Sequence, residues 1–462
     1  MNRKSPIAFA ALLAAAPVTL ALPAATGSAV PSVPLTTFTL DNGLKVVLSE
    51  DHAFPVIAYS IDYAVGSRAE PRGRSGFAHL FEHMMFQGTP NVGKGEYFKY
   101  VESNGGIFNG STHEDYTNYY AEFPAHRLEL AIWLEADRMR SLAINAENLR
   151  NQQEAVKEEK RQFIDNQAYA DAFANQLTDL AFKNYANQHS TIGSFDDLNA
   201  ASVKDVQDFF TTYYAPNNAT LVLVGDFDPD EARRLVTREF GSIPRQPAPT
   251  AVDSTEPPSS GEVRRVVRDA QAPTPGVLVA WRGPARGSTD YYALAVLEGI
   301  LFDGSSSRLY QDLVKGREVA VAIQGDMGLP GGDYVEYRSP GLFGLFVTYK
   351  PSIDARGIVG AVRSEIDRIA KEGVPADELA RAKVQFRSQV VRGLASTLDR
   401  ATRLGIYAAV DGDASRMTAD IPRFLGVSSA DIRKAAAQFL VESNRVVIEV
   451  QPAPAGGEKE GK

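Results

Sequence analysis

The sequence predicts an α/β (α+β) protein made of two homologous domains joined by a linker. The chain has 462 residues, which is more than one domain of roughly 100 to 200 residues needs. Segments with strand and helix periodicity follow one another in a similar order in the two halves, which indicates an internal duplication. Residues 246–262, between the halves, are rich in Pro, Ser and Thr, a composition typical of linkers. The predicted domains are therefore residues 36–245 and 263–452.

In the first half, alternation of apolar and polar residues predicts strands, and apolar residues three and four apart predict helices. The turn residues Asp41, Asn42 and Gly43 divide the first strand-like stretch into two alternating runs. The predicted strands cover residues 37–48, 56–65, 107–123 and 219–225, and the predicted helices cover residues 76–86, 127–140 and 147–165.

The second half repeats this order after the linker. The polar residues 453–462 that follow its last strand are predicted to be a disordered tail. The predicted strands cover residues 276–281, 341–349 and 445–450, and the predicted helices cover residues 291–301, 355–372 and 375–396.

Charge and cysteine content narrow the classes of function. The chain carries 57 acidic and 48 basic side chains, a net charge of −9. This excess of acid argues against a nucleic acid or an anionic membrane surface as a partner. The chain has no cysteine, which excludes disulfides, thiolate metal ligands and a cysteine nucleophile. Any metal must therefore be bound by His, Asp or Glu.

The N-terminal residues 1–29 have the pattern of a secretory signal peptide. Arg3 and Lys4 precede an apolar run at residues 7–22, and small residues follow it. An uncleaved membrane anchor is the alternative, although the run is short for a bilayer span. We therefore expect a periplasmic or secreted protein without stable membrane insertion.

The strongest chemical signal is the sequence His79-Leu80-Phe81-Glu82-His83 in the first predicted helix. Residues three and four apart share a helix face, so His79, Glu82 and His83 project into one space. Two imidazoles at this spacing suit zinc, although manganese or cobalt also accept them. The carboxylate between them is placed to take a proton from water. Histidine pairs on helices are often only surface residues, but the added glutamate favours a metal site.

A catalytic zinc site needs a third protein ligand, and the helix predicted at residues 147–165 offers one. Gln152, Val156 and Glu159 are spaced by four and then three residues, so they lie on one face. Taken alone, this charge-rich helix also fits an ordinary solvated face. Glu159 is thus a candidate ligand whose assignment depends on its context.

The motif and Glu159 together resemble the pitrilysin and mitochondrial-processing-peptidase family of zinc metallopeptidases, the inverzincins of M16 type. The resemblance implies one Zn²⁺ per chain, bound by His79, His83 and Glu159, with Glu82 as general base. It also implies two domains of the processing-peptidase type, each a mixed or antiparallel sheet packed with helices, which form half of a clam-shaped chamber. Further matching segments are residues 40–44 (Leu-Asp-Asn-Gly-Leu), 105–109 (Gly-Gly-Ile-Phe-Asn), 117–120 (Thr-Asn-Tyr-Tyr), 214–218 (Tyr-Ala-Pro-Asn-Asn) and 224–227 (Val-Gly-Asp-Phe).

The same resemblance assigns a substrate strand and a supporting residue. The strand is similar to the family's edge strand, on which an extended peptide adds to the sheet, although an ordinary edge strand or loop is the alternative. Gln152 stands where several members carry a glutamate, and we expect it to orient the site without binding the metal. The residues of the expected substrate strand are Phe108, Asn109, Gly110, Ser111 and Thr112.

The second half departs from the family pattern. Members that bind substrate there carry an Arg and, seven residues later, a Tyr, and these positions fall on Val314 and Val321. Valine cannot donate a hydrogen bond to a peptide carbonyl. Arg317 is close but out of register. The resemblance therefore implies a catalytic subunit that forms a heterodimer with a homologous, metal-free partner carrying the Arg/Tyr pair.

These observations predict a zinc-dependent endopeptidase that hydrolyses peptides or unfolded segments. Two alternatives remain open: a non-catalytic binding or assembly subunit of the same fold, and a peptidase dedicated to one precursor. His113 with Glu114 and Asp115 also forms a polar group, for which a loop beside the substrate strand is favoured over a second metal cluster. The remaining three histidines, His52, His126 and His189, have no partners that the sequence identifies.

Overall fold

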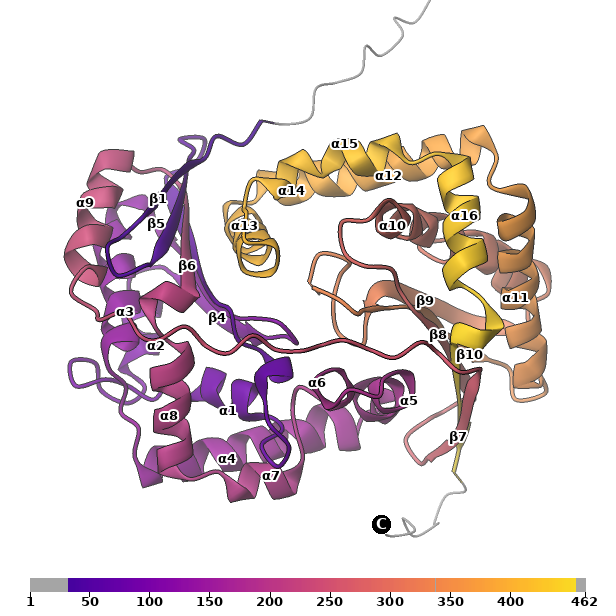
Figure 1. The fold of residues 1–462 in the computed structure, drawn as a ribbon, viewed down its shortest axis with the longest axis horizontal. Helices are drawn as coiled ribbons and strands as arrows, with labels where there is room; N and C mark the ends of the chain where they lie inside the picture. The colour runs from indigo at the N-terminus through magenta and orange to yellow at the C-terminus, as the bar shows by residue number, and fades with distance from the viewer. Residues whose placement is uncertain (1–31, 337, 454–462) are drawn as a thin grey trace, which may run out of the picture.

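The computed structural model describes residues 32–336 and 338–453. The predicted signal peptide at residues 1–29 lies outside these ranges, and so does all of the predicted tail except its first residue. Two α/β units, each built on one sheet, lie side by side and are bridged by helices (Figure 1). This confirms the predicted two-domain α/β architecture.

The first sheet has six strands in the order β1-β2-β6-β3-β5-β4. Only β2 and β6 pair in parallel, and every other neighbouring pair is antiparallel. Its strands are β1 (Thr36–Thr39), β2 (Lys45–Glu50), β3 (Val56–Tyr63), β4 (Ile107–Thr112), β5 (Thr117–Pro124) and β6 (Ala219–Gly225).

The second sheet has five strands in the order β7-β11-β8-β10-β9. Its one parallel pair, β7 and β11, corresponds to β2 and β6 in the first sheet, and the three antiparallel pairs correspond in the same order. Edge strand β9 therefore stands where β4 stands in the first sheet, which supports an internal duplication. Its strands are β7 (Val263–Asp269), β8 (Gly276–Arg282), β9 (Ala320–Leu329), β10 (Leu342–Tyr349) and β11 (Arg445–Pro452).

Helices pack on the sheets through apolar faces. The core of the first unit lies between its sheet and helices that include α1, α3, α8 and α9, and that of the second lies between its sheet and α10, α11 and α16. The helices of the first unit are α1 (Phe77–Met84), α2 (Glu96–Ser103), α3 (Leu128–Arg140), α4 (Ala146–Lys160), α5 (Leu177–Ala181), α6 (Tyr185–Gln188), α7 (Phe195–Ala200), α8 (Val203–Tyr213) and α9 (Pro229–Phe240). Those of the second are α10 (Thr289–Leu301), α11 (Ala355–Glu372), α12 (Ala376–Ala395), α13 (Thr397–Asp411), α14 (Arg416–Ala419), α15 (Ile421–Gly426) and α16 (Ser429–Phe439).

Each unit contributes helical residues that pack on the sheet of the other unit. Helix α13, from the second half of the chain, packs on β3, β5 and β6 of the first sheet (Figure 1). In return, α5 and the π-helical turn Ala172–Gln176 of the first half pack on the second sheet, where Leu177 contacts a cluster that includes Leu278 and Ile448. The two units are thus joined by two exchanged hydrophobic contacts in addition to the connecting chain.

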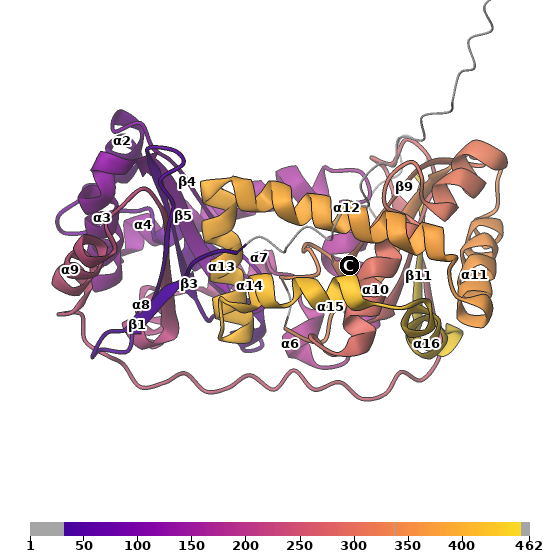
Figure 2. The same ribbon diagram turned by 90° about the horizontal axis from the view of Figure 1, so that it is seen from above.

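The connection between α9 and β7 contains no helix or strand, and it runs along the outside of the molecule (Figure 2). Its far end is nevertheless fixed to the first unit. The Glu256 carboxylate accepts hydrogen bonds from the backbone N–H groups of Lys183 and Asn184 and from the side chain of Asn187. None of the helices within the described ranges combines the length and the apolarity needed to cross a bilayer.

The structure corrects several predicted boundaries. The strand-like stretch at residues 107–123 is a hairpin of β4 and β5, because the polar residues 113–116 form a turn. The helix predicted over 147–165 ends as an α-helix at Lys160 and continues as the π-helical turn Arg161–Asp165. Strands β7 and β9 and the bridging helix α13 were not predicted, because their apolar residues face the other unit or alternate only weakly.

Candidate metal centre

Helix α1 carries the motif with its polar residues on one face. Leu80, Phe81 and Met84 are about 1% exposed and anchor the helix in the core, so His79, Glu82 and His83 occupy the remaining face. The helix begins after Gly76, whose φ of 82° favours glycine. The buried Glu70 carboxylate accepts the N–H groups of Gly76 and Ala78 at 2.9 and 2.7 Å and so caps the helix.

Helix α4 brings Glu159 to the two histidines. Buried Val156 holds this part of α4 in the core. Glu159 Oε2 lies 3.2 Å from His83 Nε2 and 3.6 Å from His79 Nε2. One ligand atom from each of the three residues lies within 4.8 Å of the others, and they form the only group of this kind found among the described residues. The residues that the sequence separates by 76 positions therefore converge on one point.

The electrostatics of the three residues suit a cation between them. Burial lowers the pKa of His79 to about 4, so its imidazole is neutral. Burial also disfavours a charged His83, but the hydrogen bond with Glu159 and the charge of Glu82 outweigh it and raise the pKa of His83. Burial opposes ionisation of Glu159, yet His83 and His79 lower its pKa.

This donor set fits Zn²⁺. Zinc accepts imidazole nitrogen and carboxylate oxygen, and catalytic sites use three protein ligands with one position left for water. Two neutral imidazoles and one carboxylate leave part of the metal charge uncompensated, which is the condition for activating that water. The His79 Nδ1 atom is buried, and it has no hydrogen-bond partner among the described residues, so packing holds this side of the imidazole ring.

Glu82 points from the same helix toward the end of β4. Its Oε2 accepts a hydrogen bond of 2.6 Å from the Thr112 hydroxyl at the end of β4. Burial raises the pKa of Glu82 to about 7, although the hydrogen bond from Thr112 opposes the shift. A carboxylate with a pKa near neutrality is suited to take a proton and release it again.

Strand β4 pairs with β5 on one side only, so among the described strands it is an edge of the first sheet. The predicted substrate residues lie on this strand. Gly110 faces Glu82 so closely that a Cβ would lie 3.1 Å from Glu82 Oε1. Glycine therefore leaves space for the carboxylate, a role that the sequence did not reveal. Phe108 packs against Phe86 and Phe98 and anchors the strand.

Two of these side chains are held by neighbours. The Ser111 hydroxyl donates to Asn118 Oδ1 at 2.6 Å, and Asn109 Oδ1 accepts the N–H of Gly110 at 3.0 Å. Gln152 is hydrogen bonded to His83 and contributes to the raised pKa of that residue. Gln152 therefore contacts a residue of the candidate metal centre.

The structure also provides partners for histidines that the sequence left unassigned. His189 Nε2 lies 2.9 Å from Glu70, the residue that caps α1, so it supports the metal helix indirectly. His52 lies between Glu50 and Asp226 on the surface. His113 stacks on Tyr116, and burial lowers the pKa of His113 to about 4. No sequence spacing indicated the contacts of His189 with Glu70 and of His52 with Asp226, because these partners come from distant segments.

The sequence is similar to those of known peptidases. Residues 45–194 match the description "Insulinase (Peptidase family M16)", and residues 200–386 match "Peptidase M16 inactive domain". The zinc protease PqqE of Helicobacter pylori is 27% identical over 419 residues, which cover 90% of this chain and 92% of the relative. The mitochondrial-processing peptidase subunit beta of Lentinula edodes is 24% identical over 409 residues, 87% of this chain and 86% of the relative.

Solved structures show the same architecture. A protease from Helicobacter pylori has a TM-score of 0.85 at 26% identity, and the match covers 91% of this chain and 100% of that chain. The periplasmic protease PqqL from Escherichia coli has a TM-score of 0.72 at 17% identity. That match covers 92% of this chain but 48% of PqqL, and it shows the fold alone.

Proposed function

Because the chain belongs to peptidase family M16, as its sequence motifs indicated, we propose that it is a zinc-dependent endopeptidase for peptides or unfolded segments. One observation carries the proposal. The donor atoms of His79, His83 and Glu159 meet within 4.8 Å, and Glu82 stands beside them with a hydrogen bond to an edge strand. A ligand set, a base and a surface for an extended chain are thus present at one place.

A zinc ion held by His79, His83 and Glu159 would supply Lewis-acid activation of water and of the scissile carbonyl. Glu82 takes the proton of the attacking water, because its carboxylate lies next to the ligands with a pKa of about 7. It then passes this proton to the leaving amine. The Thr112 hydroxyl fixes the Glu82 carboxylate during both transfers through its bond to Oε2.

Strand β4 is proposed to bind the substrate main chain. An extended peptide can add to a free sheet edge through backbone hydrogen bonds, which makes binding tolerant of sequence. The strand ends at Thr112, the residue bonded to the base, so a peptide paired with β4 passes directly in front of Glu82. Folded proteins do not offer such a free segment and are expected to resist cleavage.

The decisive experiment is cleavage of quenched fluorescent peptides by the zinc-loaded chain supplemented with a native extract, with and without a chelator. We expect chelator-sensitive hydrolysis that falls by roughly 10²- to 10⁴-fold in Glu82→Gln, the usual contribution of a general base. The variant should keep its zinc. Glu158→Gln is the matched control, because Glu158 neighbours the proposed ligand Glu159 but is exposed, and within the described part of the chain it forms an ion pair only with Arg161. Retained turnover in Glu82→Gln would remove it from the role of base.

A second part of the proposal concerns a partner. At the positions where relatives are expected to carry Arg and Tyr, Val314 is packed against the core of the second unit and Val321 is 57% exposed on β9. Neighbouring Arg317 is paired with Asp312. These observations support a catalytic subunit that works with a homologous, metal-free subunit carrying the Arg/Tyr pair.

The partner proposal is tested by comparing the purified chain with the chain supplemented with a native extract. Activity that needs the extract and disappears in Glu82→Gln supports the heterodimer. Full activity of the chain alone, at the expected zinc content, contradicts it. The same assay separates a general peptidase from one dedicated to a single precursor, since a dedicated enzyme would leave a mixed peptide pool almost uncut.

A non-catalytic binding or assembly subunit is the remaining alternative. The second unit is of that kind, because α10, which follows β8 as α1 follows β3, contains no histidine. The first unit carries all three ligands and the base. A zinc content near zero after reconstitution would favour the alternative, whereas about one zinc per chain supports the peptidase.

Export to the periplasm or the medium is also part of the proposal and follows from the pattern at residues 1–29. N-terminal sequencing of the native protein tests it. A mature chain that starts near residue 26 or 30 would agree, and an intact N-terminus would contradict cleavage.

A further inference from the structure

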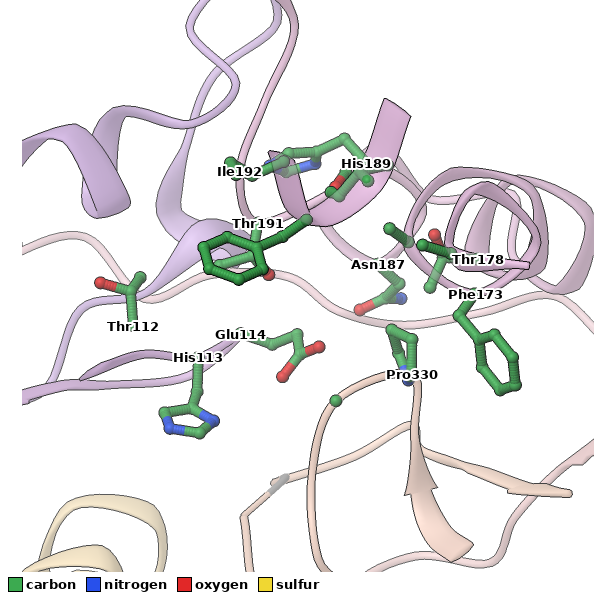
Figure 3. A pocket seen from close by; sticks show the side chains of 16 residues that line it. Thr112, His113, Glu114, Phe173, Thr178, Asn187, His189, Thr191, Ile192 and Pro330 are labelled. Atoms are coloured by element: carbon green, nitrogen blue, oxygen red, sulfur yellow. The ribbon is translucent and has the colours of Figure 1, made fainter. Parts of the chain in front are cut away.

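Residues from both units line a cavity of about 460 Å³ (Figure 3). Thr112, the last residue of β4, belongs to its wall and also donates the hydrogen bond to Glu82. The cavity therefore begins one hydrogen bond away from the proposed base. A side chain of a peptide lying along β4 can reach it within a few residues of the reacting bond.

One wall of this cavity is apolar and continues from the helix that carries Glu159. After α4 ends, the chain turns through residues whose side chains face the cavity, and Phe163 is 55% exposed there. A concave surface with an exposed aromatic ring is suited to an apolar group or to the hydrocarbon stem of a longer side chain. The apolar side chains of this wall are Phe163, Ile164, Ala170, Phe173 and Ala174.

The opposite wall carries a carboxylate. Glu114 lies in the turn after β4, and Figure 3 shows its carboxyl group directed toward Asn187 and Pro330 across the cavity. The backbone is fixed, because the N–H of Arg68 donates to the Glu114 carbonyl at 3.0 Å. Burial raises the pKa of Glu114, and the charges of Arg68 and His189 only partly offset this effect.

The cationic groups around Glu114 already have other partners. Arg68 pairs with Asp115 at 2.6 Å and donates to the Pro340 carbonyl of the second unit. His189 pairs with Glu70 at 2.9 Å. Among the described residues, no Lys, Arg or His forms an ion pair with the Glu114 carboxylate. An acidic group thus stands at the wall of a partly apolar cavity without an ion-pair partner among the described residues.

We propose that this cavity binds a basic side chain of the peptide substrate, lysine or arginine, with Glu114 as its counter-charge and the Phe163 wall against its hydrocarbon stem. The inference rests on the proposed peptidase function and adds a specificity-determining residue to it. A purely apolar side chain would displace water from Glu114 and supply no hydrogen bond in return, which is unfavourable. A basic side chain can pair with the Glu114 carboxylate through its charged end and pack against the Phe163 wall through its hydrocarbon stem.

The proposal is tested by binding, so that it does not depend on turnover. In a Glu82→Gln background, fluorescence anisotropy measures the affinity of labelled peptides that carry Lys, its neutral analogue norleucine, or Glu at one position at a time. At one position the Lys peptide is expected to bind roughly 10- to 100-fold more tightly than the norleucine peptide, the range for a hydrogen-bonded charge pair.

Variants of the two walls distinguish their roles. Glu114→Gln should abolish the difference between Lys and norleucine, and Glu114→Lys should invert the preference toward Glu. Phe163→Ala should weaken binding of the Lys and norleucine peptides by a similar factor, because both stems lose the same contact. Glu372→Gln is the matched control, since Glu372 is exposed at the end of α11 in the second unit.

Equal affinity for the Lys and norleucine peptides at every position would overturn the proposal, and so would a Lys preference that survives in Glu114→Gln. Cleavage by the wild-type chain supplemented with a native extract is measured in parallel. Active enzyme without a basic preference contradicts the cavity assignment alone. Absence of cleavage together with the expected binding preference contradicts the proposed catalysis and leaves the cavity assignment supported.

Discussion

At the residue scale, burial shifts the pKa values of two residues of α1 in opposite directions. Burial disfavours charge, so it lowers the pKa of His79 to about 4 and raises the pKa of Glu82 to about 7. The first effect keeps an imidazole neutral, as a metal ligand must be. The second leaves a carboxylate that exchanges protons near neutral pH. The proposed ligand and the proposed base therefore lie on the same helix and in the same buried environment.

The ligand role of Glu159 predicts a change in metal content. Glu159→Gln removes the only negative ligand, so zinc affinity should fall by more than the roughly 10- to 100-fold that loss of an outer hydrogen-bond partner costs. Metal analysis after dialysis against a weak chelator should give far less than one zinc per chain. Gln152→Ala, which removes a hydrogen-bond partner of His83, should lose less. Equal zinc content in Glu159→Gln and wild type would contradict the assignment.

A second residue-scale prediction concerns Asp62, a fully buried acid on β3. Burial raises its pKa to about 7, although hydrogen bonds from Ser60 and Asn118 oppose the shift. The unfolded chain releases this proton near the ordinary pKa of 3.8, so between about pH 4 and pH 7 the folded state holds more protons and its stability falls as the pH rises. The cost at neutral pH is at most about 4 kcal/mol, at about 1.4 kcal/mol per pKa unit.

Asp62→Asn removes this titration and should therefore be more stable than wild type above about pH 7. The difference in thermal unfolding midpoint between variant and wild type should shrink as the pH is lowered toward 4. Melting curves at several pH values measure it directly. A difference that does not change with pH would show that Asp62 ionises normally in the folded protein.

At the element scale, α13 explains how a helix from one half completes the sheet of the other. Gly405 lies where the helix crosses Asp62, and a Cβ at this position would overlap the Asp62 carboxylate. Ala401 and Leu404 on the same helix are fully buried against the sheet. The small residue thus allows close contact between α13 and β3, and the larger ones supply the apolar area.

This packing predicts that replacing Gly405 by alanine changes the free energy of unfolding in the opposite direction to the same replacement at an uncrowded helix position. Gly405→Ala should destabilise the protein by roughly 1–3 kcal/mol or more, because the added methyl group overpacks the contact. Gly360→Ala on α11 is the matched control, since nothing lies within 4 Å of a Cβ there. It should stabilise the protein by about 0.5–1 kcal/mol through helix propensity. Equal effects of the two substitutions in chemical unfolding would contradict the close contact.

At the scale of the whole molecule, the two units are held together by mutual burial. The cluster around α13 joins Val222 of the first sheet to Leu404, and the cluster around α5 joins Leu177 to Leu278 of the second sheet. These contacts do not depend on the connection between α9 and β7. The Glu114 cavity is lined by both units, since Pro330 belongs to the second unit. Mutual burial of the two units therefore also holds the walls of this cavity in place.

Cleavage of the connecting chain should therefore leave the molecule intact. A specific protease site inserted between Ala248 and Thr250, where the chain is largely exposed, should give two fragments that elute together at the mass of the uncut protein. Zinc content and peptide cleavage should be retained within about twofold. Separation of the fragments in size-exclusion chromatography without denaturant would show that the exchanged helices do not hold the units together.

The sequence alone determined the fold class, the duplication and the local chemistry of α1. These features depend on periodicity and on side chains one helical turn apart, and local spacing fixes both. The spacing of His79, Glu82 and His83 is therefore sufficient to place them on one face of a helix. The family resemblance added Glu159 and the substrate strand, which spacing alone left ambiguous.

Only the tertiary structure decided which distant segments meet. The closeness of Glu70 and His189, the exchange of α13, the space that Gly110 leaves for Glu82, and the unpaired carboxylate of Glu114 all arise from contacts between segments far apart in the chain. Such contacts leave no periodic pattern in the sequence, because they depend on how whole helices and strands pack against one another. The sequence therefore specified the reacting groups, while packing specified their surroundings and the cavity beside them.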